Sequence, residues 1–372
     1  MTKILHISKF YPPYRGGIED VCYSVVDILK SNPQYSQKVL CFNDKKETVT
    51  EMVDGVEVIR AGIKGIKKSQ PISFRMYSIL RRTINSFRPD YIHLHLPNPL
   101  TGLYVSMLIK KDCKLILHWH SDIVEQAKLY KLVKPFENRL LKRAYKIIAT
   151  SPNYIDGSKP LMSVKEKTVV IPNIINEEKL KLSPNVEKTV QAIKEKYNGK
   201  PIVLFIGRHV QYKGIEFLIA AAKHIHSECA IVIGGSGPLT EKLKKGTSYP
   251  RIHFIGRIPD EEMTAYYYAA SVFAFPSITK NEAFGVALAE AMYCNTPAVT
   301  YTIEGSGVNW VNVKDQTGLE VENSSVEQLG GAIDTLLTDN ILREKFASAA
   351  RKRVETLFMK NSITESIFEL YR

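Results

Sequence analysis

The chain has 372 residues, of which 44% are apolar and 24% are charged, a composition that excludes a disordered or fibrous protein. Its length exceeds the size at which one core usually stops growing, so we expect two domains, and no apolar run approaches the ~20 residues of a membrane-spanning helix. The net charge of +13 favours an anionic partner: a phosphorylated substrate, a nucleic acid or an anionic membrane surface.

The first residues, MTKILHISKF, resemble a buried strand and lack the apolar region and cleavage site of a signal peptide. We therefore expect a cytoplasmic protein. The five cysteines are scattered, odd in number and without a CxxC pair, which argues against both disulfides and zinc.

Short β-branched runs alternate with helical stretches along the whole chain. The predicted strands are KILHIS, QKVLCF, VEVIR, YIHLH, KLILH, KIIAT and TVVI in the first half, and IVLFI, CAIVI, RIHFI, VFAF and PAVT in the second. This alternation predicts an α/β protein with two Rossmann-like, doubly wound parallel-sheet domains that face a central cleft. The polar stretch 176–200 is the expected linker. Ligands of such sheets bind at the carboxyl ends of the strands.

Two loops after predicted strands have residues suited to phosphate. Gly16 and Gly17 in PPYRGGIE can bring a ligand close to the N–H groups of the next helix; a tight turn alone is the alternative. In IVLFIGRHVQYKG, Arg208 follows a strand and Lys213 precedes a helix, so the two cations can clamp a diphosphate; solvated surface charges are the alternative. No GxGxxG occurs there, so the nicotinamide dinucleotide fingerprint is absent.

Two carboxylates bracket the apolar segment AFGVALA. Glu282 precedes a predicted helix, and Glu290 lies eight residues further along. Backbone N–H groups at a helix start bind phosphate, and a carboxylate accepts hydrogen bonds from neighbouring sugar hydroxyls. Glu282 is therefore a candidate for binding a sugar and Glu290 for binding a ribose. A helix-capping acid and a buried ion-pair partner are the alternatives.

These segments together resemble glycosyltransferase family 4, whose members are retaining enzymes of the GT-B fold. Glu282-AFGVALA-Glu290 is similar to the E-x7-E motif of the family, IGRHVQYKG to its G-R-x4-K-G segment and PPYRGGIE to its amino-terminal glycine loop. The resemblance covers nearly the whole chain. It implies an acceptor-binding domain over residues 1–180, completed by a crossover helix at 355–372, and a donor-binding domain over residues 181–354.

The resemblance implies a role for each matching residue. Arg208 and Lys213 would neutralise the nucleotide diphosphate, Glu282 would hold the donor sugar and Glu290 the ribose. His120, in KLILHWHSD, would contact the donor sugar near the reacting carbon. The backbone at Phe284 and Gly285 would contact the sugar and the β-phosphate, and the backbone around Arg257 and Ile258 would bind the base. The other donor-binding positions that it implies are Gly16, Gly17, Ala283 and Val286.

The expected mechanism needs neither a metal nor a cofactor. The chain contains no DxD sequence for a metal–diphosphate bridge. The resemblance implies front-face displacement, in which the departing phosphate takes the proton of the acceptor, so we assign no protein nucleophile and treat Glu282 as a positioning group. The nucleotide sugar is a co-substrate.

Paired histidines raise the question of a metal site. HLH at 93–95 and HWH at 118–120 place two rings each on one face of a strand, which makes metal binding geometrically possible. HIH at 224–226 would point its rings about 200° apart on a helix. We expect core or cleft-lining histidines and no metal, with His120 as the one functional member.

Two basic segments suggest that the protein reaches its acceptor at an anionic membrane surface. Residues 64–88 carry seven basic residues and no acid, and residues 128–146 carry seven basic residues and one acid. Apolar neighbours such as Phe74, Met76 and Leu80 could help them to dock on an anionic leaflet; amphipathic helices with solvated lysines are the alternative. Peripheral membrane association would suit a lipid-linked, lipopolysaccharide or capsule oligosaccharide acceptor.

The donor is indicated by one further segment. GSGVNWVNVKDQTGLEV is similar to a segment of mannosyl- and rhamnosyl-type transferases, which favours a GDP-mannose type of donor, with a UDP-sugar next. The alternatives are a GT-B epimerase or sugar phosphorylase, and a non-enzymatic nucleotide or nucleic-acid binding protein. The last leaves the two glutamates and the Arg208/Lys213 pair without a task, so we expect no nucleic-acid partner.

Overall fold

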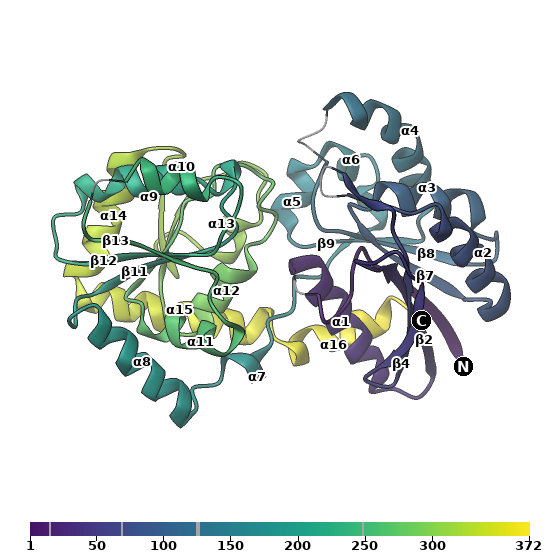
Figure 1. The fold of residues 1–372 in the computed structure, drawn as a ribbon, viewed down its shortest axis with the longest axis horizontal. Helices are drawn as coiled ribbons and strands as arrows, with labels where there is room; N and C mark the ends of the chain where they lie inside the picture. Colours follow the sequence, from purple (N-terminus) through teal and green to yellow (C-terminus); the bar gives the residue numbers. More distant parts are fainter. Residues whose placement is uncertain (15, 68–69, 124–126, 248) are drawn as a thin grey trace. The chain divides into compact units, whose positions relative to one another are not determined.

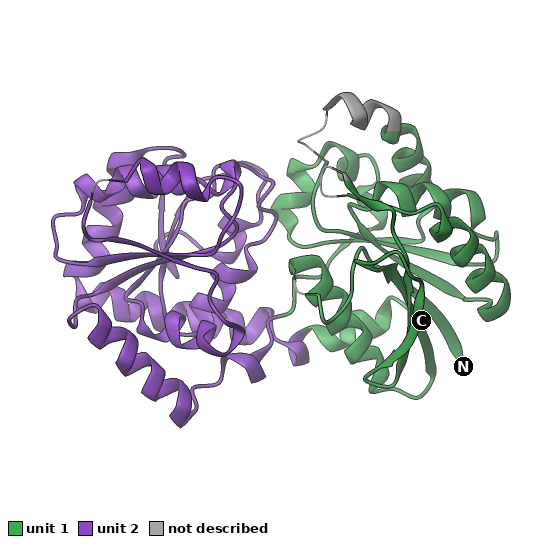
Figure 2. Cartoon of the chain, in the orientation of Figure 1, with its two compact units in different colours: residues 1–174, 363–372 green, residues 175–362 purple. Residues whose placement is uncertain are grey.

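A computed structural model describes residues 1–14, 16–67, 70–123, 127–247 and 249–372. Contacts divide the chain into two compact units, Met1–Ile174 with Ile363–Arg372, and Ile175–Ser362 (Figure 2). Each unit has a central sheet with helices packed on it (Figure 1). The chain therefore returns to the first unit at its end, later than the predicted position at residue 355.

The first unit contains an eight-stranded sheet in the order β10-β9-β8-β7-β1-β2-β4-β3. Its strands are β1 (Thr2–Ile7), β2 (Tyr35–Phe42), β3 (Val49–Val53), β4 (Val56–Ala61), β7 (Tyr91–Leu96), β8 (Lys114–Trp119), β9 (Lys146–Ala149) and β10 (Thr168–Val170). Every pair is parallel except β3 with β4. The predicted strands are confirmed. The sequence pattern missed β3 because its side chains are mostly exposed, and it missed the small hairpin β5 (Gly65–Lys67) and β6 (Gln70–Ile72).

Helices cover this sheet, and one of them comes from the C-terminal end of the chain. They are α1 (Gly17–Lys30), α2 (Arg75–Phe87), α3 (Pro99–Leu108), α4 (Ala127–Arg143), α5 (Pro152–Gly157), α6 (Lys159–Met162) and α16 (Lys360–Glu369). In α1, Val21, Val25 and Leu29 recur every fourth residue and are buried. They belong to one apolar cluster with Ile367 and Tyr371, so the C-terminal segment is part of the core of the first unit.

The second unit is built on a six-stranded parallel sheet in the order β13-β12-β11-β14-β15-β16. Its strands are β11 (Ile202–Ile206), β12 (Ala230–Gly234), β13 (Ile252–Gly256), β14 (Val272–Phe275), β15 (Ala298–Tyr301) and β16 (Gly318–Val321). The central strands are buried throughout, which is why they read as continuous apolar runs. β16 escaped prediction because it is a short edge strand with a charged residue.

The helices of the second unit are α7 (Glu177–Leu180), α8 (Pro184–Lys196), α9 (Ile215–Ala221), α10 (Thr240–Lys245), α11 (Asp260–Ala269), α12 (Val286–Tyr293), α13 (Val308–Val311), α14 (Val326–Thr338) and α15 (Asn340–Leu357). Within the described ranges of both units, no helix is long and apolar enough to cross a membrane.

The stretch 176–200, predicted as a linker, packs into the second unit instead. Thr264 Oγ1 donates a hydrogen bond to the carbonyl of Lys179 at 2.6 Å, and Tyr268 OH donates to that of Leu180 at 3.1 Å. Helix α8 packs against α11. Polar composition misled the prediction, because these bonds use backbone carbonyls that any sequence provides.

Candidate active site

Strands β11 and β14 are neighbours, and the loops after their carboxyl ends pack against each other. The backbone N–H of Ile278 donates to the carbonyl of Tyr212 at 2.9 Å. Gly214 adopts a φ of +62°, and a Cβ at this position would clash with the carbonyl of Pro276. The close approach of the two loops therefore requires glycine at this position.

Lys213 and Glu282 form a buried ion pair at this junction. Nζ of Lys213 donates to Oε2 of Glu282, and each side chain is only 12% exposed. Ser277 Oγ donates to the same carboxylate oxygen at 3.2 Å. Burial lowers the pKa of Lys213, but the Glu282 carboxylate opposes this and the net pKa is raised, so Lys213 stays cationic. The sequence predicted that Lys213 binds the diphosphate and that Glu282 binds the donor sugar. In the structure, each of the two residues is the counter-ion of the other.

Arg208 lies in the same loop as Lys213, and its side chain is exposed. The neighbouring His209 is anchored, because its Nδ1 lies 2.9 Å from Thr240 Oγ1 and its backbone N–H donates to the carbonyl of Ser236 at 3.1 Å. The loop after β12 thus holds the backbone beside Arg208. The guanidinium lies on the surface at the carboxyl edge of the sheet, where the sequence predicted a diphosphate clamp.

A serine that sequence reasoning did not single out holds the backbone of Glu282. Ser306 Oγ donates to the carbonyl of Glu282, and the N–H of Gly307 donates to the carbonyl of Ala283 at 3.1 Å. Both donors belong to the GSGV stretch that the sequence analysis used only as an indication of the donor. A serine–glycine pair before a short helix was the available signal.

The residues that follow Glu282 begin helix α12. Phe284 is buried against the ring of Phe358, with centroids 5.2 Å apart. Gly285 has a φ of +88°, and a Cβ there would lie 3.1 Å from the ring of Phe275. Val286 is the first helical residue. The predicted sugar- and phosphate-binding backbone is therefore a glycine turn at a helix start.

Glu290 lies inside α12 and already has a partner. Tyr267 OH donates to Oε2 of Glu290 at 2.8 Å. Burial raises the pKa of Tyr267, and the Glu290 carboxylate raises it further. A ribose bound at Glu290, as the sequence predicts, would share the carboxylate with this tyrosine.

Arg257 and Ile258 follow β13 at the same edge of the sheet. Gly256 adopts a φ of +72°, and its carbonyl accepts a hydrogen bond from the N–H of Gly235 at 2.6 Å. Ile258 is buried and leaves no space for a side chain on Gly234, whereas Arg257 is exposed. The side chain of Ile258 is thus used for packing, and the backbone stays the predicted base-binding group.

In the first unit, an acid lies beside the predicted glycine loop. Gly17 begins α1, and a Cβ on Gly16 would clash with the carboxylate of Glu19. Burial raises the pKa of Glu19. The sequence analysis did not include Glu19, and Arg15 of the same motif lies outside the described residues.

His120 follows the end of β8 and is 8% exposed. Its Nε2 lies 3.0 Å from Nδ1 of His95. Next to it, Trp119 Nε1 donates to Asp122 Oδ1 at 2.9 Å, which fixes the start of the loop. Burial lowers the pKa of His120 to about 3, so its imidazole is neutral at physiological pH and can act as a hydrogen-bonding group but not as a cation.

Two family models match this chain in succession. The model described as Glycosyltransferase Family 4 matches residues 15–179, and the model described as Glycosyl transferases group 1 matches residues 186–353. This chain belongs to glycosyltransferase family 4. The resemblance found in the sequence is confirmed, and the family 4 enzyme has one matched region in each unit.

Curated relatives span the whole length of this family 4 enzyme. It is 27% identical to O-antigen chain mannosyltransferase C of Escherichia coli, over 99% of this chain and 98% of the relative. It is 28% identical to the D-rhamnosyltransferase WbpZ of Pseudomonas aeruginosa, over 96% of this chain and 92% of the relative.

Solved structures confirm the GT-B fold of the enzyme. Sucrose-phosphate synthase from Thermosynechococcus elongatus matches with a TM-score of 0.79 and 21% identity, over 100% of this chain and 98% of that one. HepE from Anabaena, solved with UDP and glucose, matches with a TM-score of 0.79 and 18% identity, over 100% and 99%. WaaG, a glycosyltransferase involved in lipopolysaccharide biosynthesis, matches with a TM-score of 0.74 and 16% identity, over 99% of both chains.

Proposed function

We propose that this family 4 enzyme is a retaining, metal-independent hexosyltransferase that builds a bacterial type of surface polysaccharide. It takes a hexose or deoxyhexose from a nucleotide diphosphate sugar and adds it to a lipid-linked, lipopolysaccharide or capsule oligosaccharide. The observation that carries this proposal is the buried Lys213–Glu282 pair, which lies in the same loop system as the exposed Arg208 at the carboxyl edge of the second sheet.

The charges at this edge suit a departing diphosphate. Lys213 keeps its proton because Glu282 compensates its charge, and Arg208 supplies a second cation. As the bond between the sugar carbon and the phosphate oxygen breaks, negative charge grows on the phosphate, and cations beside it stabilise it most at that stage. The acceptor oxygen forms its bond to the same carbon from the same side, and the phosphate oxygen takes the acceptor proton.

Glu282 has a positioning role in this scheme. Hydrogen bonds from Lys213 and Ser277 fix the orientation of its carboxylate. Carboxylate oxygens accept hydrogen bonds from sugar hydroxyls, so a fixed carboxylate would hold the sugar in one orientation. Because two cations already compensate the diphosphate, the scheme needs no metal ion at this position.

The names of the relatives support a GDP-mannose type of donor. Two relatives with near full-length coverage are a mannosyltransferase and a D-rhamnosyltransferase. A UDP-sugar remains the second candidate, because the structurally similar HepE was solved with UDP-glucose. Among the residues that the structure describes, no feature favours an epimerase or a phosphorylase, and a nucleic-acid binding protein would leave the Lys213–Glu282 pair without a function.

Peripheral membrane association of a cytoplasmic enzyme is part of the proposal, with a smaller apolar surface than the sequence suggested. Met76 and Leu80 are fully buried in the first unit and are therefore unavailable to a membrane. Phe74 and Phe136 are exposed, as are the basic residues Arg81 and Arg82 of α2, among others. Lys68 and the side chains of residues 124–132 lie outside the described part of the chain.

Thermal shift against GDP-, UDP-, dTDP- and ADP-sugars, with EDTA present, tests the donor proposal. A ligand that binds the folded state raises the unfolding midpoint. At a concentration one hundred times its Kd, it increases the free energy of unfolding by about 2.7 kcal/mol. We expect a response to GDP-mannose or a related sugar and transfer that survives EDTA. No response to any of these sugars from folded protein would contradict the proposal.

A further inference from the structure

Five buried histidines lie along one face of the first sheet. His6 is in β1, His93 and His95 are in β7, His118 is in β8 and His120 follows it; none is more than 8% exposed. His6 is opposite His93 in the parallel register, and His95 is opposite His118. Three neighbouring strands therefore bring these rings together.

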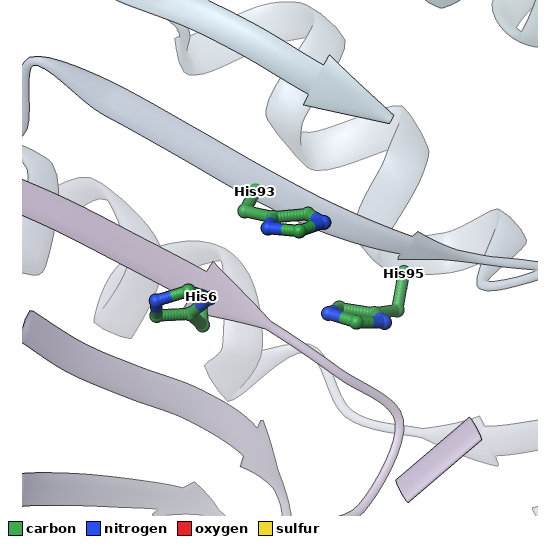
Figure 3. A group of neighbouring side chains, drawn as sticks. All are labelled: His6, His93 and His95. Carbon is green, nitrogen blue, oxygen red and sulfur yellow. The ribbon is translucent and has the colours of Figure 1, made fainter. Parts of the chain in front are cut away.

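Three of these residues form a compact group (Figure 3). One ring nitrogen each of His6, His93 and His95 lies within 4.8 Å of one ring nitrogen of each of the other two. The ring centroids of His6 and His93 are 5.5 Å apart, and those of His93 and His95 are 4.7 Å apart. Figure 3 shows the three rings beside one another, one projecting from β1 and two from β7.

Each of the three rings uses one nitrogen and leaves the other without a partner. The hydrogen-bonded nitrogens are His6 Nε2 with Gln37 Oε1 at 3.0 Å, His93 Nδ1 with Tyr371 OH at 2.6 Å and His95 Nδ1 with His120 Nε2 at 3.0 Å. The other nitrogens, His6 Nδ1, His93 Nε2 and His95 Nε2, have no hydrogen-bond partner among the described residues.

One hydrogen-bonded nitrogen and one unpartnered nitrogen in the same ring are typical of a histidine that binds a metal. A histidine that binds a metal almost always engages its second nitrogen in a hydrogen bond, which fixes the orientation of the ring. Burial lowers the pKa of His6 to about 4 and that of His93 and His95 well below the ordinary value, so the rings are neutral. Neutral imidazole is the form that binds metal, and a buried unpartnered nitrogen costs free energy until something binds it.

We propose that His6, His93 and His95 bind a transition-metal ion of the zinc class. Three imidazole nitrogens suit zinc, nickel, cobalt or copper, whereas magnesium and calcium take oxygen ligands. Bonds of about 2.0–2.1 Å to zinc place the nitrogens about 3.4 Å apart, so the rings turn toward one another when the ion binds.

The ion would tie three segments of the first unit together. It would link β1 to β7 directly, and the hydrogen bond from His93 to Tyr371 would extend this link to the C-terminal segment. Its role is structural. The proposed transfer reaction assigns no role to His6, His93 or His95, so the two proposals can be tested separately.

A second triad, His95, His118 and His120, also has nitrogens within 4.8 Å of one another. In that triad His95 Nδ1 and His120 Nε2 are hydrogen-bonded to each other, and the bond would have to break for both to bind an ion there. Both nitrogens of His118 lack a partner among the described residues. In the first triad each ring has one nitrogen without a partner in the described part of the chain, so an ion that binds these nitrogens would leave the existing hydrogen bonds in place, and this is the triad we assign.

Metal analysis of the full-length protein, purified without a histidine tag, tests the assignment. Because the rings are buried, the ion should be supplied during expression or by refolding with zinc or cobalt. We expect one equivalent per chain by elemental analysis, and cobalt loading should give the absorption bands of nitrogen coordination. A folded wild-type protein that binds less than a tenth of an equivalent after refolding with either metal would overturn the proposal.

Variants locate the site. We expect His6→Gln and His93→Gln to lose the metal, while His118→Gln and the exposed His226→Gln retain it. Tyr371→Phe keeps all three ligands and removes only the outer hydrogen bond of His93, so it should bind 10–100-fold more weakly. Circular dichroism checks that each variant is folded. Retention of the metal by folded His6→Gln or His93→Gln, or its loss in His118→Gln alone, would contradict the assignment.

Discussion

Lys213 and Glu282 lie 69 residues apart in the chain and form an ion pair between the loops that follow two neighbouring strands. The pair joins a residue predicted to bind phosphate with one predicted to bind sugar. Its charges neutralise each other, so it can persist at a junction where each side chain is only 12% exposed.

Replacing Glu282 with alanine should abolish transfer and destabilise the second unit. Removal of one partner of a buried pair leaves an uncompensated charge, which costs about 3 kcal/mol or more. A bound diphosphate would replace Glu282 as the counter-ion of Lys213, and Arg208 is unchanged, so we expect nucleotide affinity to be largely retained. Urea unfolding and nucleotide titration measure the two effects. Glu228→Ala is the matched control, because its pair with Lys200 is exposed and should change stability by less than about 1 kcal/mol.

Replacing Arg208 with alanine should weaken nucleotide binding without changing stability. Its side chain is exposed, and the loss of a charge-assisted hydrogen bond to phosphate lowers affinity about 10–100-fold. Calorimetric titration with the nucleoside diphosphate provides the measurement. Arg257→Ala is the control, because only the backbone is predicted to act at that position. Equal losses in the two variants would argue against a specific role for the Arg208 guanidinium.

Replacing Ser306 with alanine should reduce turnover more than nucleotide affinity. The variant loses the hydrogen bond to the carbonyl of Glu282, worth about 1 kcal/mol, and loosens the residue that positions the sugar. Steady-state kinetics separate kcat from KM for the donor. Ser163→Ala removes a similar hydrogen bond to the carbonyl of Pro160, far from the site in sequence and exposed, and should leave kcat unchanged. An unchanged kcat in Ser306→Ala would show that the contact is only structural.

The row of buried histidines predicts acid sensitivity of the first unit. Burial lowers the pKa of His6 to about 4 and that of His120 to about 3, so the unfolded chain binds protons more readily than the folded one. The free energy of unfolding is therefore highest above pH 6.5 and decreases as the pH falls toward 4. Each such histidine lowers it by about 1.4 kcal/mol per pH unit in this range. Urea unfolding at pH 7.5, 6.5 and 5.5 measures the slope. The same stability at pH 7.5 and pH 5.5 would contradict this prediction.

Much of the candidate site was visible before the structure. The glycine turn at Gly285, the cations at 208 and 213 and the carboxylates at 282 and 290 follow strands or flank helices that were recognisable by pattern. The partners of these residues were not. Tyr267 and Ser306 contact the two glutamates from elements 23 and 24 residues away, and no local pattern marks such contacts.

The amino-acid sequence by itself determined most of the strands of the two sheets, and the family. Strands buried on both faces of a parallel sheet appear in the sequence as continuous apolar runs, and short motifs mark the loops between them. Only the tertiary structure decided that Lys213 is paired with Glu282, that residues 176–200 belong to the second unit, and that His6 lies beside His93 and His95. These relationships depend on strand order and register. Both are set by packing between segments far apart in the chain, which local pattern does not record.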